Sequence, residues 1–444
     1  MVDSDAHIVN APGSQRRGWL FAMLIVILAA TVLRWGTDIR ATPLVFDEKY
    51  ITIPIIDLIE RGWSVETAID FTETKGPAMI WTYAFFGELL GGEINDLRFL
   101  SMAFFVGAIV PLVLIARRLG LTSKQIAAVS VLYVLLPMNA VLGQMVMSES
   151  SFIFGCAWLS WIFLWGFRDN ATNERRVLGP LLFGALLAIL LHHRVHAVAF
   201  AGAAALISFE RDRWRSWPWW IACIIAGVLR VPLWIRWGGL VAPDYQFSHT
   251  LGISLNNLTY LAAAMLPYTG VFLLAWIVRP DWRRDHWKIV AIGAFIGLLL
   301  GIIAPPLASH TIVWGDRDLF RFQGIVAAAL GKLSPRLGGD PAYLALIAMA
   351  STVGVASLAA LAARAWRFGV SNPYGQVHRM LVWTLFVGWG MYIATDGQVF
   401  DRYILPWAIL APITWLLLLP RPLLWLQIVQ LMFVSLWFVV TKLY

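Results

Sequence analysis

The chain has 444 residues, of which 59% are hydrophobic and only 14% are charged. A soluble domain is typically about 45–50% apolar and about 25% charged, so this composition predicts an integral membrane protein. The formal net charge of +8 then indicates basic cytoplasmic loops and contacts with anionic lipid or phosphate. Nucleic-acid binding is excluded because it requires a soluble basic face.

In chain order, a polar segment of residues 1–17 predicts a cytoplasmic tail, followed by one transmembrane domain over residues 18–444. Arg16 and Arg17 precede the first apolar run, and no small-residue cleavage site follows it, so we expect an uncleaved span. Runs of about 17–25 apolar residues predict an all-α polytopic fold with about thirteen transmembrane helices and no C-terminal soluble domain. The expected spans are 18–35, 97–116, 122–138, 151–167, 177–192, 195–209, 217–235, 258–278, 287–305, 341–363, 380–395, 403–419 and 422–440, with a further half-helix near 322–333.

Basic residues orient these spans. With the N-terminus inside, the short loops expected in the cytoplasm carry clusters of arginine, for example at 211–215 and 279–288. Short cytoplasmic loops are enriched in Lys and Arg, whereas long loops escape the rule. The long first loop, residues 36–96, is therefore expected outside the cytoplasm.

Two interfacial helices are expected within this first loop. Apolar residues on one face predict an amphipathic helix beginning near Pro54, and Pro77 begins an apolar segment that ends at Gly91. The second segment, at about 14 residues, is short for a span and suits the membrane interface. The two helices would hold Asp47, Glu48 and Lys75 at one membrane surface.

The acidic pair Asp47–Glu48 directly follows the first hydrophobic segment. Carboxylates beside a bilayer are costly to desolvate unless they are paired, bind a metal or take part in a reaction. Taken alone, this pair is open to three interpretations: a metal site, a general base, or ion pairs with neighbouring cations. Lys75 could neutralise a phosphate or extend toward the headgroup region.

Several short motifs are distributed along the chain: Phe46–Tyr50, Glu73–Pro77, Phe86–Leu90, Asp96–Ser101, Met147–Ser150 and Asp401–Pro406. Together they resemble motifs of the GT-C membrane glycosyltransferases. The sequence is most similar to the branch that contains protein O-mannosyltransferases and bacterial lipid A aminoarabinose transferases. The match is graded, because this chain has Lys-Gly-Pro-Ala and Arg-Phe-Leu-Ser where the family has Lys-Pro-Pro-Leu-like and Arg-Leu-Pro-Ser-like segments. The likeness covers about residues 18–155 and 396–420.

The resemblance implies inverting transfer of a sugar from a polyprenyl-phosphate donor to an acceptor hydroxyl. Asp47 would be the base, and Glu48 a ligand or an orienting group. Cations would stabilise the leaving phosphate. The candidate donor phosphate-binding residues are Lys75, Arg194, Arg402 and Tyr403.

A second group of residues is expected to bind the acceptor or a metal. Glu149 comes from the second acidic motif, and packing into a polar patch is an equal alternative. His193 and His196 have a spacing that suits metal ligands, although interfacial histidines often only form hydrogen bonds. A divalent metal ion is therefore an open alternative for this site.

The expected partners are a polyprenyl-phosphate-linked sugar, a lipid, glycan or protein acceptor, and membrane lipids, with no nucleic acid. The resemblance places the protein in a bacterial or archaeal plasma membrane, with its active site facing outside. Two rival functions are a polytopic lipid or sugar transporter and an O-antigen-type ligase. A transporter would gather charges in the middle of the membrane and often has two related halves. The charges here gather at one face.

Overall fold

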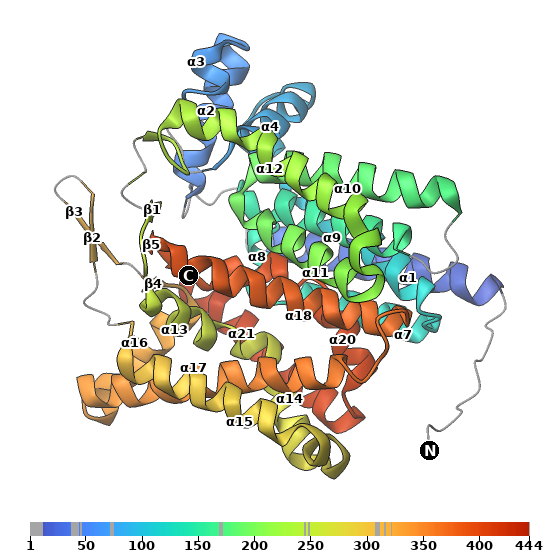
Figure 1. The fold of residues 1–444 in the computed structure, drawn as a ribbon. Coiled ribbons are helices and arrows are strands. Elements are labelled where there is room, and N and C mark those ends of the chain that lie inside the picture. Colours follow the sequence, from blue (N-terminus) through green and yellow to red (C-terminus); the bar gives the residue numbers. More distant parts are fainter. Residues whose placement is uncertain are drawn as a thin grey trace.

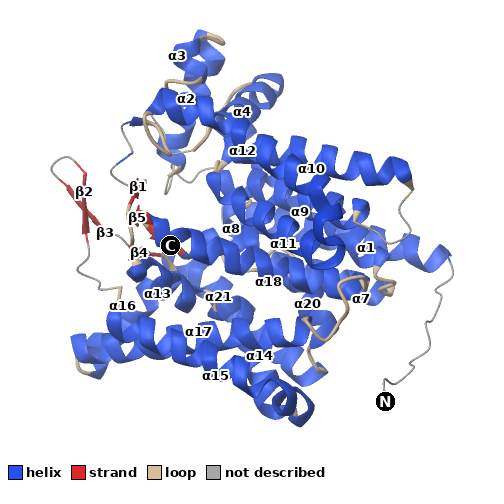
Figure 2. Cartoon of the chain, in the orientation of Figure 1, coloured by secondary structure: helices blue, strands red, loops and turns tan. Residues whose placement is uncertain are grey.

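A computed structural model describes residues 12–36, 44, 47–71, 75–167, 172–243, 246, 249–306, 311–314, 317–320 and 322–443. The described chain is mostly helical (Figures 1 and 2). The helices of the first half are α1 (Pro12–Gly36), α2 (Glu48–Arg61), α3 (Val65–Ala68), α4 (Pro77–Leu90), α5 (Ile94–Gly107), α6 (Ile109–Arg118), α7 (Ser123–Val134), α8 (Asn139–Leu142), α9 (Ser148–Gly166), α10 (Asn173–His193), α11 (Val198–Asp212) and α12 (Trp217–Trp237). The second half contains α13 (Leu255–Ala264), α14 (Leu266–Val278), α15 (Pro280–Ile303), α16 (Ile325–Leu337), α17 (Asp340–Ala365), α18 (Pro373–Met391), α19 (Ile404–Trp407), α20 (Ala411–Leu418) and α21 (Arg421–Leu443).

The predicted spans fall on these helices, and several spans consist of two consecutive helices. Among the described residues, five helical segments are long and apolar enough to cross a bilayer, or six if one bent pair forms a single span. The all-helical, multi-pass membrane architecture is thereby confirmed, whereas the number thirteen stays a prediction. Span 258–278 is the bent pair: α13 and α14 meet at 69°. Pro267, in the first turn of α14, lacks the N–H that would continue α13.

Helices α2, α3 and α4 of the first loop lie together at the top of Figure 1. Helix α4 has the predicted bounds, and Ile51, Ile55 and Leu58 of α2 are buried as expected. The predicted start of α2 near Pro54 is wrong, because the helix begins at Glu48 and contains the proline. The carbonyl oxygen of Asp47 accepts the first helical N–H groups, so the helix is established before the proline removes one donor.

Three short strand pairs add to the expected all-helical architecture. Antiparallel pairs join β1 (His249–Leu251) to β5 (Thr395–Gly397) and β2 (Thr311–Trp314) to β3 (Arg317–Phe320). A parallel pair joins β4 (Phe322–Gln323) to β6 (Val399–Phe400). The β1–β5 and β4–β6 pairs connect loops that are far apart in the sequence, and they hold residues 395–400 immediately before Arg402. The half-helix predicted near 322–333 is α16, which begins at Ile325 after β4.

Candidate active site

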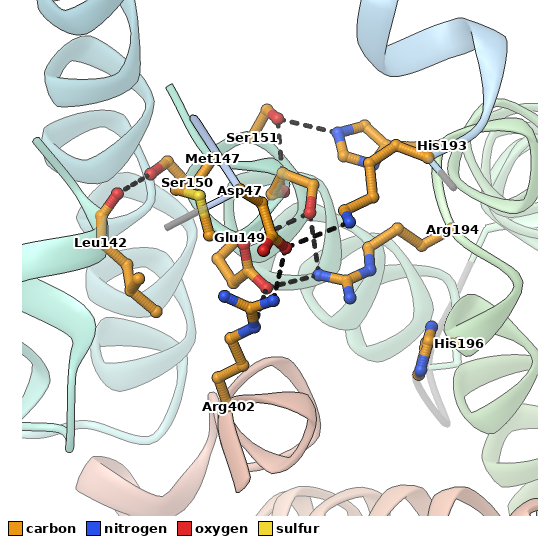
Figure 3. Close-up of polar contacts among 12 residues, drawn as sticks. Asp47, Leu142, Met147, Glu149, Ser150, Ser151, His193, Arg194, His196 and Arg402 are labelled. Atoms are coloured by element: carbon orange, nitrogen blue, oxygen red, sulfur yellow. Dashed lines mark hydrogen bonds and ion pairs between the residues drawn. The ribbon is translucent and has the colours of Figure 1, made fainter. Parts of the chain in front are cut away.

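Asp47 lies in a cluster of charged side chains from five parts of the chain, and Figure 3 shows Glu149, Arg194 and Arg402 beside it. One of its carboxylate oxygens, Oδ2, is 3.3 Å from Nζ of Lys75 and 2.5 Å from a terminal guanidinium nitrogen of Arg402. About 29% of the Asp47 side chain is exposed, whereas the two cations are almost fully buried. The carboxylate is therefore accessible to a ligand, while protein surrounds the cations that hold it.

The two cations determine how Asp47 titrates. Its protein surroundings oppose ionisation, but the charges and hydrogen bonds of Arg402 and Lys75 are stronger and hold the pKa of Asp47 well below its ordinary value. Burial would lower the pKa of Arg402, but the charge and hydrogen bond of Asp47 and the charge of Glu149 outweigh this effect and raise that pKa. In the ligand-free protein, Asp47 is an ionised carboxylate and a weak proton acceptor.

Glu149 is the second carboxylate of this cluster and has no exposed side-chain surface. Its Oε1 lies 2.7 Å from a terminal nitrogen of Arg194 and 3.3 Å from Nε of Arg402. Arg194 also donates a hydrogen bond to the hydroxyl of Ser148. Arg402 is thus shared by Asp47 and Glu149, as Figure 3 shows. The buried Glu149 carboxylate accepts hydrogen bonds from Arg194 and from the Ser148 hydroxyl, and the charge of Arg402 adds an ion pair.

Glu48 is placed differently from its neighbour Asp47. Its carboxylate is completely buried and receives two hydrogen bonds from Arg98, at 2.8 and 2.7 Å. The backbone N–H of Val146 donates a third hydrogen bond to it. Glu48 therefore connects the start of α2 to α5 and to the loop before Glu149, and its role is to position both acidic segments.

Lys75 is positioned by the glycine that follows it. The N–H of Gly76 donates to the carbonyl oxygen of His193 at 2.9 Å, and a Cβ at this glycine would lie 1.8 Å from the carbonyl oxygen of His192. Only glycine allows the two backbones to approach this closely. Arg230 is also buried, and it donates a hydrogen bond to the carbonyl oxygen of Leu191, which lies at the same end of α10 as His192 and His193.

Tyr403 and the two histidines surround Arg194. The guanidinium of Arg194 lies 5.1 Å from the ring centre of Tyr403, a cation–π contact, and Tyr403 also contacts the ring of His196. His193 forms a hydrogen bond with Ser151 at 2.7 Å, and His196 forms one with Tyr392. In Figure 3, His196 lies apart from the carboxylates.

A metal does not fit these side chains well. Among the described residues, no three His, Cys, Asp or Glu side chains gather in a way that could hold a metal ion. The candidate ligands already have protein partners: Arg98 for Glu48, Arg194 for Glu149, Ser151 for His193 and Tyr392 for His196.

Sequence reasoning did not assign Arg98, Gly76 or Asp401, although all three lie within the quoted motifs. Asp401 is buried and accepts hydrogen bonds from the Tyr260 hydroxyl and the Val326 N–H, which fixes the loop that carries Arg402. The motif residues Phe46, Glu73 and Thr74 lie outside the described residues. An unassigned charge within a motif was the signal for Arg98 and Asp401.

No protein-family model matches the sequence, and no curated protein sequence matches it. Among solved structures, the chain is similar to ArnT from Cupriavidus metallidurans bound to undecaprenyl phosphate, with 14% identity and a TM-score of 0.45 over 94% of this chain and 78% of that one. It is also similar to the apo state of ArnT, with 14% identity and a TM-score of 0.43 over 89% of this chain and 76% of that one. The similarity concerns the fold, so the function has to be argued from the site.

Proposed function

We propose that the protein is a glycosyltransferase that moves a sugar from a polyprenyl-phosphate donor to an acceptor hydroxyl at the extracytoplasmic membrane face. The observation that carries this proposal is the accessible Asp47 carboxylate, held by Lys75 and Arg402 through one oxygen. A carboxylate can accept the proton of the attacking hydroxyl. Two preorganised cations can stabilise the charge that develops on a leaving phosphate. Both requirements of sugar transfer from a phosphate are met within one cluster.

The step is a single displacement. The acceptor oxygen attacks the anomeric carbon, the bond between that carbon and the phosphate oxygen breaks, and the configuration inverts. The hydroxyl proton goes to Asp47, and the electron pair of the broken bond leaves with the polyprenyl phosphate. Because that phosphate departs with one more negative charge than the donor carried, the interactions with Lys75 and Arg402 are stronger in the transition state than before it.

Donor binding also supplies a reason for Asp47 to become basic. In the ligand-free site, Lys75 and Arg402 hold the pKa of Asp47 low. A phosphate near these cations would draw their hydrogen bonds away from the carboxylate and add a negative charge beside it. Both changes raise the pKa of Asp47. Asp47 would therefore become a competent base only when the donor is in place.

Arg194 and Glu149 complete the proposed site. Glu149 contacts Nε of Arg402, whereas Asp47 contacts a terminal nitrogen, and Arg194 holds Glu149. Truncating either group would displace Arg402 rather than remove the base. No step of the proposed reaction passes through a metal.

The test is sugar transfer by the full chain reconstituted in vesicles, with a panel of radiolabelled polyprenyl-phosphate sugars. We expect Asp47→Asn to reduce the transfer rate by about 100-fold or more, because general-base catalysis contributes about that much. Asp57→Asn is a matched control, since Asp57 lies on the adjacent helix and pairs with exposed Arg61. Equal rates for wild type and Asp47→Asn would refute the assignment of Asp47. Labelled lipid that crosses the bilayer without any transfer would support a transporter instead.

A further inference from the structure

The turn between α11 and α12 lies at the end of these helices away from the Asp47 cluster. Helix α11 begins directly after the short turn that contains His196, and α12 runs back beside it, because the Trp220 indole N–H donates to the carbonyl oxygen of Ala205. With 15 residues, α11 is about 22 Å long. This length is most of the thickness of a hydrocarbon core, about 30 Å. The turn therefore lies on the membrane side opposite the site, the side expected in the cytoplasm.

Two tryptophans and two arginines of this turn are exposed. Trp214 is 77% exposed and Trp217 is 59% exposed, and the side chains of Arg213 and Arg215 beside them are exposed as well. Within the described part of the chain, neither guanidinium has an ion pair or a hydrogen bond, and that of Arg213 lies 5.3 Å from the ring centre of Phe209. Tryptophan is enriched at the membrane–water interface, and guanidinium groups recognise phosphate. This combination indicates a surface that contacts lipid headgroups.

The carboxylates of the same segment are already paired with other cations. Glu210 forms an ion pair with Arg379 of α18, and Asp212 forms one with its neighbour Arg211 at 2.7 Å. These carboxylates therefore leave the two exposed guanidinium groups of the turn without a counter-charge. A positive charge beside exposed indole rings is complementary to an anionic membrane surface.

Arg213 adopts a backbone conformation that favours glycine. Its φ and ψ angles are +50° and −126°, a region that side chains rarely allow. The N–H of Arg213 donates to the carbonyl oxygen of Phe209, and its own carbonyl oxygen accepts a hydrogen bond from the Ser216 hydroxyl, so contacts on both sides maintain this conformation. Such strain costs stability, and a glycine would remove it. An arginine at this position therefore indicates that the guanidinium itself is required there.

We propose that the α11–α12 turn, residues Arg213–Trp217, binds the phosphate of an anionic lipid in the leaflet opposite the candidate active site. Its two arginines contact the phosphate through charge-assisted hydrogen bonds, and its two tryptophans lie at the depth of the headgroups. The exposed apolar side chains of Ile221 and Ile224, on the following turns of α12, continue the surface toward the acyl chains. The site is independent of the proposed sugar transfer.

The first experiment titrates phosphatidylglycerol into phosphatidylcholine nanodiscs that hold the full chain, and counts the retained lipid by native mass spectrometry. We expect the double variant Arg213→Gln/Arg215→Gln to bind phosphatidylglycerol at least about tenfold more weakly than wild type, because each basic residue near an anionic membrane contributes a factor of about five. Arg175→Gln/Arg176→Gln is the matched control, since it removes the same charge from the same membrane side, at the start of α10. Equal losses in the two double variants would overturn the proposal, because the lipid would then respond to overall charge.

Arg213→Gly tests the meaning of the strained backbone. In phosphatidylcholine alone, this variant should unfold at the temperature of wild type or above it, because the strain is relieved. Phosphatidylglycerol should then raise its unfolding temperature less than it raises that of wild type. A lower unfolding temperature in phosphatidylcholine would show that the arginine serves the fold, and the proposal would fail. An unchanged response to phosphatidylglycerol would also overturn it.

Two further measurements identify the ligand. A nitroxide label at Trp214→Cys, in a Cys156→Ala/Cys223→Ala background, should report headgroup depth in power-saturation experiments, and a label in bulk water would overturn the proposal. Millimolar inorganic phosphate in phosphatidylcholine should not reproduce the stabilisation by phosphatidylglycerol. If it does, the turn binds free phosphate and the assignment to a lipid is wrong. Sugar transfer in phosphatidylcholine should be equal in wild type and both double arginine variants, so a failure of this proposal is distinguishable from a failure of the proposed enzymatic function.

Discussion

The Asp47 carboxylate and the Arg402 guanidinium lie 2.5 Å apart, although 355 positions separate them in the sequence. The contact joins the first loop to the segment that follows β6, and Lys75 adds a second cation to the same carboxylate oxygen. Because Arg402 also contacts Glu149, a change at any of these residues alters the charge around Asp47. The predictions below use this coupling.

Replacing Lys75 with glutamine should move the acid limb of the pH profile to higher pH. Lys75 is one of the two cations that lower the pKa of Asp47, so its removal raises that pKa. For a carboxylate whose folded pKa is depressed, the ionised form persists as the pH falls until the folded pKa is reached. The protonated, inactive form of Asp47 should therefore extend to higher pH in Lys75→Gln than in wild type.

The measurement is kcat/KM for the donor as a function of pH in both proteins, because this ratio reports the free enzyme. Wild type should show no acid limb from Asp47 near its ordinary pKa of about 3.9 or above. Coincident acid limbs would mean that Lys75 does not control the ionisation of Asp47. Asp57→Asn serves as the control for general effects of pH on the protein.

Glu48 and Arg98 should stabilise the fold through their buried ion pair. Their ion pair is completely buried, and breaking a buried pair from one side costs about 3–5 kcal/mol because a charge is left uncompensated. Glu48→Gln should lower the unfolding temperature in detergent. Glu60→Gln, an exposed position on the same helix, is the control.

The double variant Glu48→Met/Arg98→Met distinguishes the effect of losing the ion pair from the effect of leaving one buried charge without a partner. Removing both charges leaves no buried ion without a partner, so the double variant should be more stable than either single variant. Transfer activity of the folded double variant should still be low, since Asp47 and the loop at Val146 lose their common anchor. If the double variant lost as much stability as the two single variants together, Glu48 and Arg98 would not stabilise the fold by pairing with each other.

The sequence predicted most of the residues of the site, but it did not predict which of these side chains pair with one another. The resemblance brought Asp47, Lys75, Glu149, Arg194 and Arg402 into one list, and the structure places them in one cluster. Hydrophobic periodicity reports only which face of a segment is buried. It could not show that Glu48 turns inward while its neighbour Asp47 stays accessible.

For the fold, too, the sequence predicted some features and missed others. Apolar runs identified the helical segments, because each long helix must hide its backbone from lipid. The strand pairs β1–β5 and β4–β6 join residues 77 to 148 positions apart in the sequence, and strands of two or three residues have no detectable alternation. The start of α2 was misplaced because Pro54 was taken as a helix start, a role that proline often has. Here the acceptor at Asp47 begins the helix earlier.

Chelation should not reduce transfer. The positive charge beside the proposed leaving phosphate comes from Lys75 and Arg402, and the four candidate metal ligands already have protein partners. Initial rates with and without EDTA, measured on protein dialysed against the chelator, check this expectation. A loss of activity that Mg²⁺ or Mn²⁺ restores would instead establish that a divalent ion serves the reaction.

Gly76→Ala should impair donor binding through backbone displacement. The φ angle of Gly76 is −75°, which alanine adopts without strain, so the effect arises from contact and not from backbone conformation. The added Cβ would lie 1.8 Å from the carbonyl oxygen of His192. The two backbones must separate, and Lys75 must move away from Asp47 with its neighbour. Misplacement of a catalytic group by about 1 Å can cost about 100-fold in rate, and we expect a loss of that order in kcat/KM for the donor.

Gly227→Ala is the matched control, because a Cβ at this helical glycine meets no atom within 4 Å. It should retain wild-type activity and gain slightly in stability from the better helix propensity of alanine. The acid limb of Gly76→Ala should also move to higher pH, as in Lys75→Gln, because the lysine no longer reaches the carboxylate. An active Gly76→Ala variant with an unchanged pH profile would show that the Lys75 segment tolerates the displacement, and that the close approach to His192 does not set the position of Lys75.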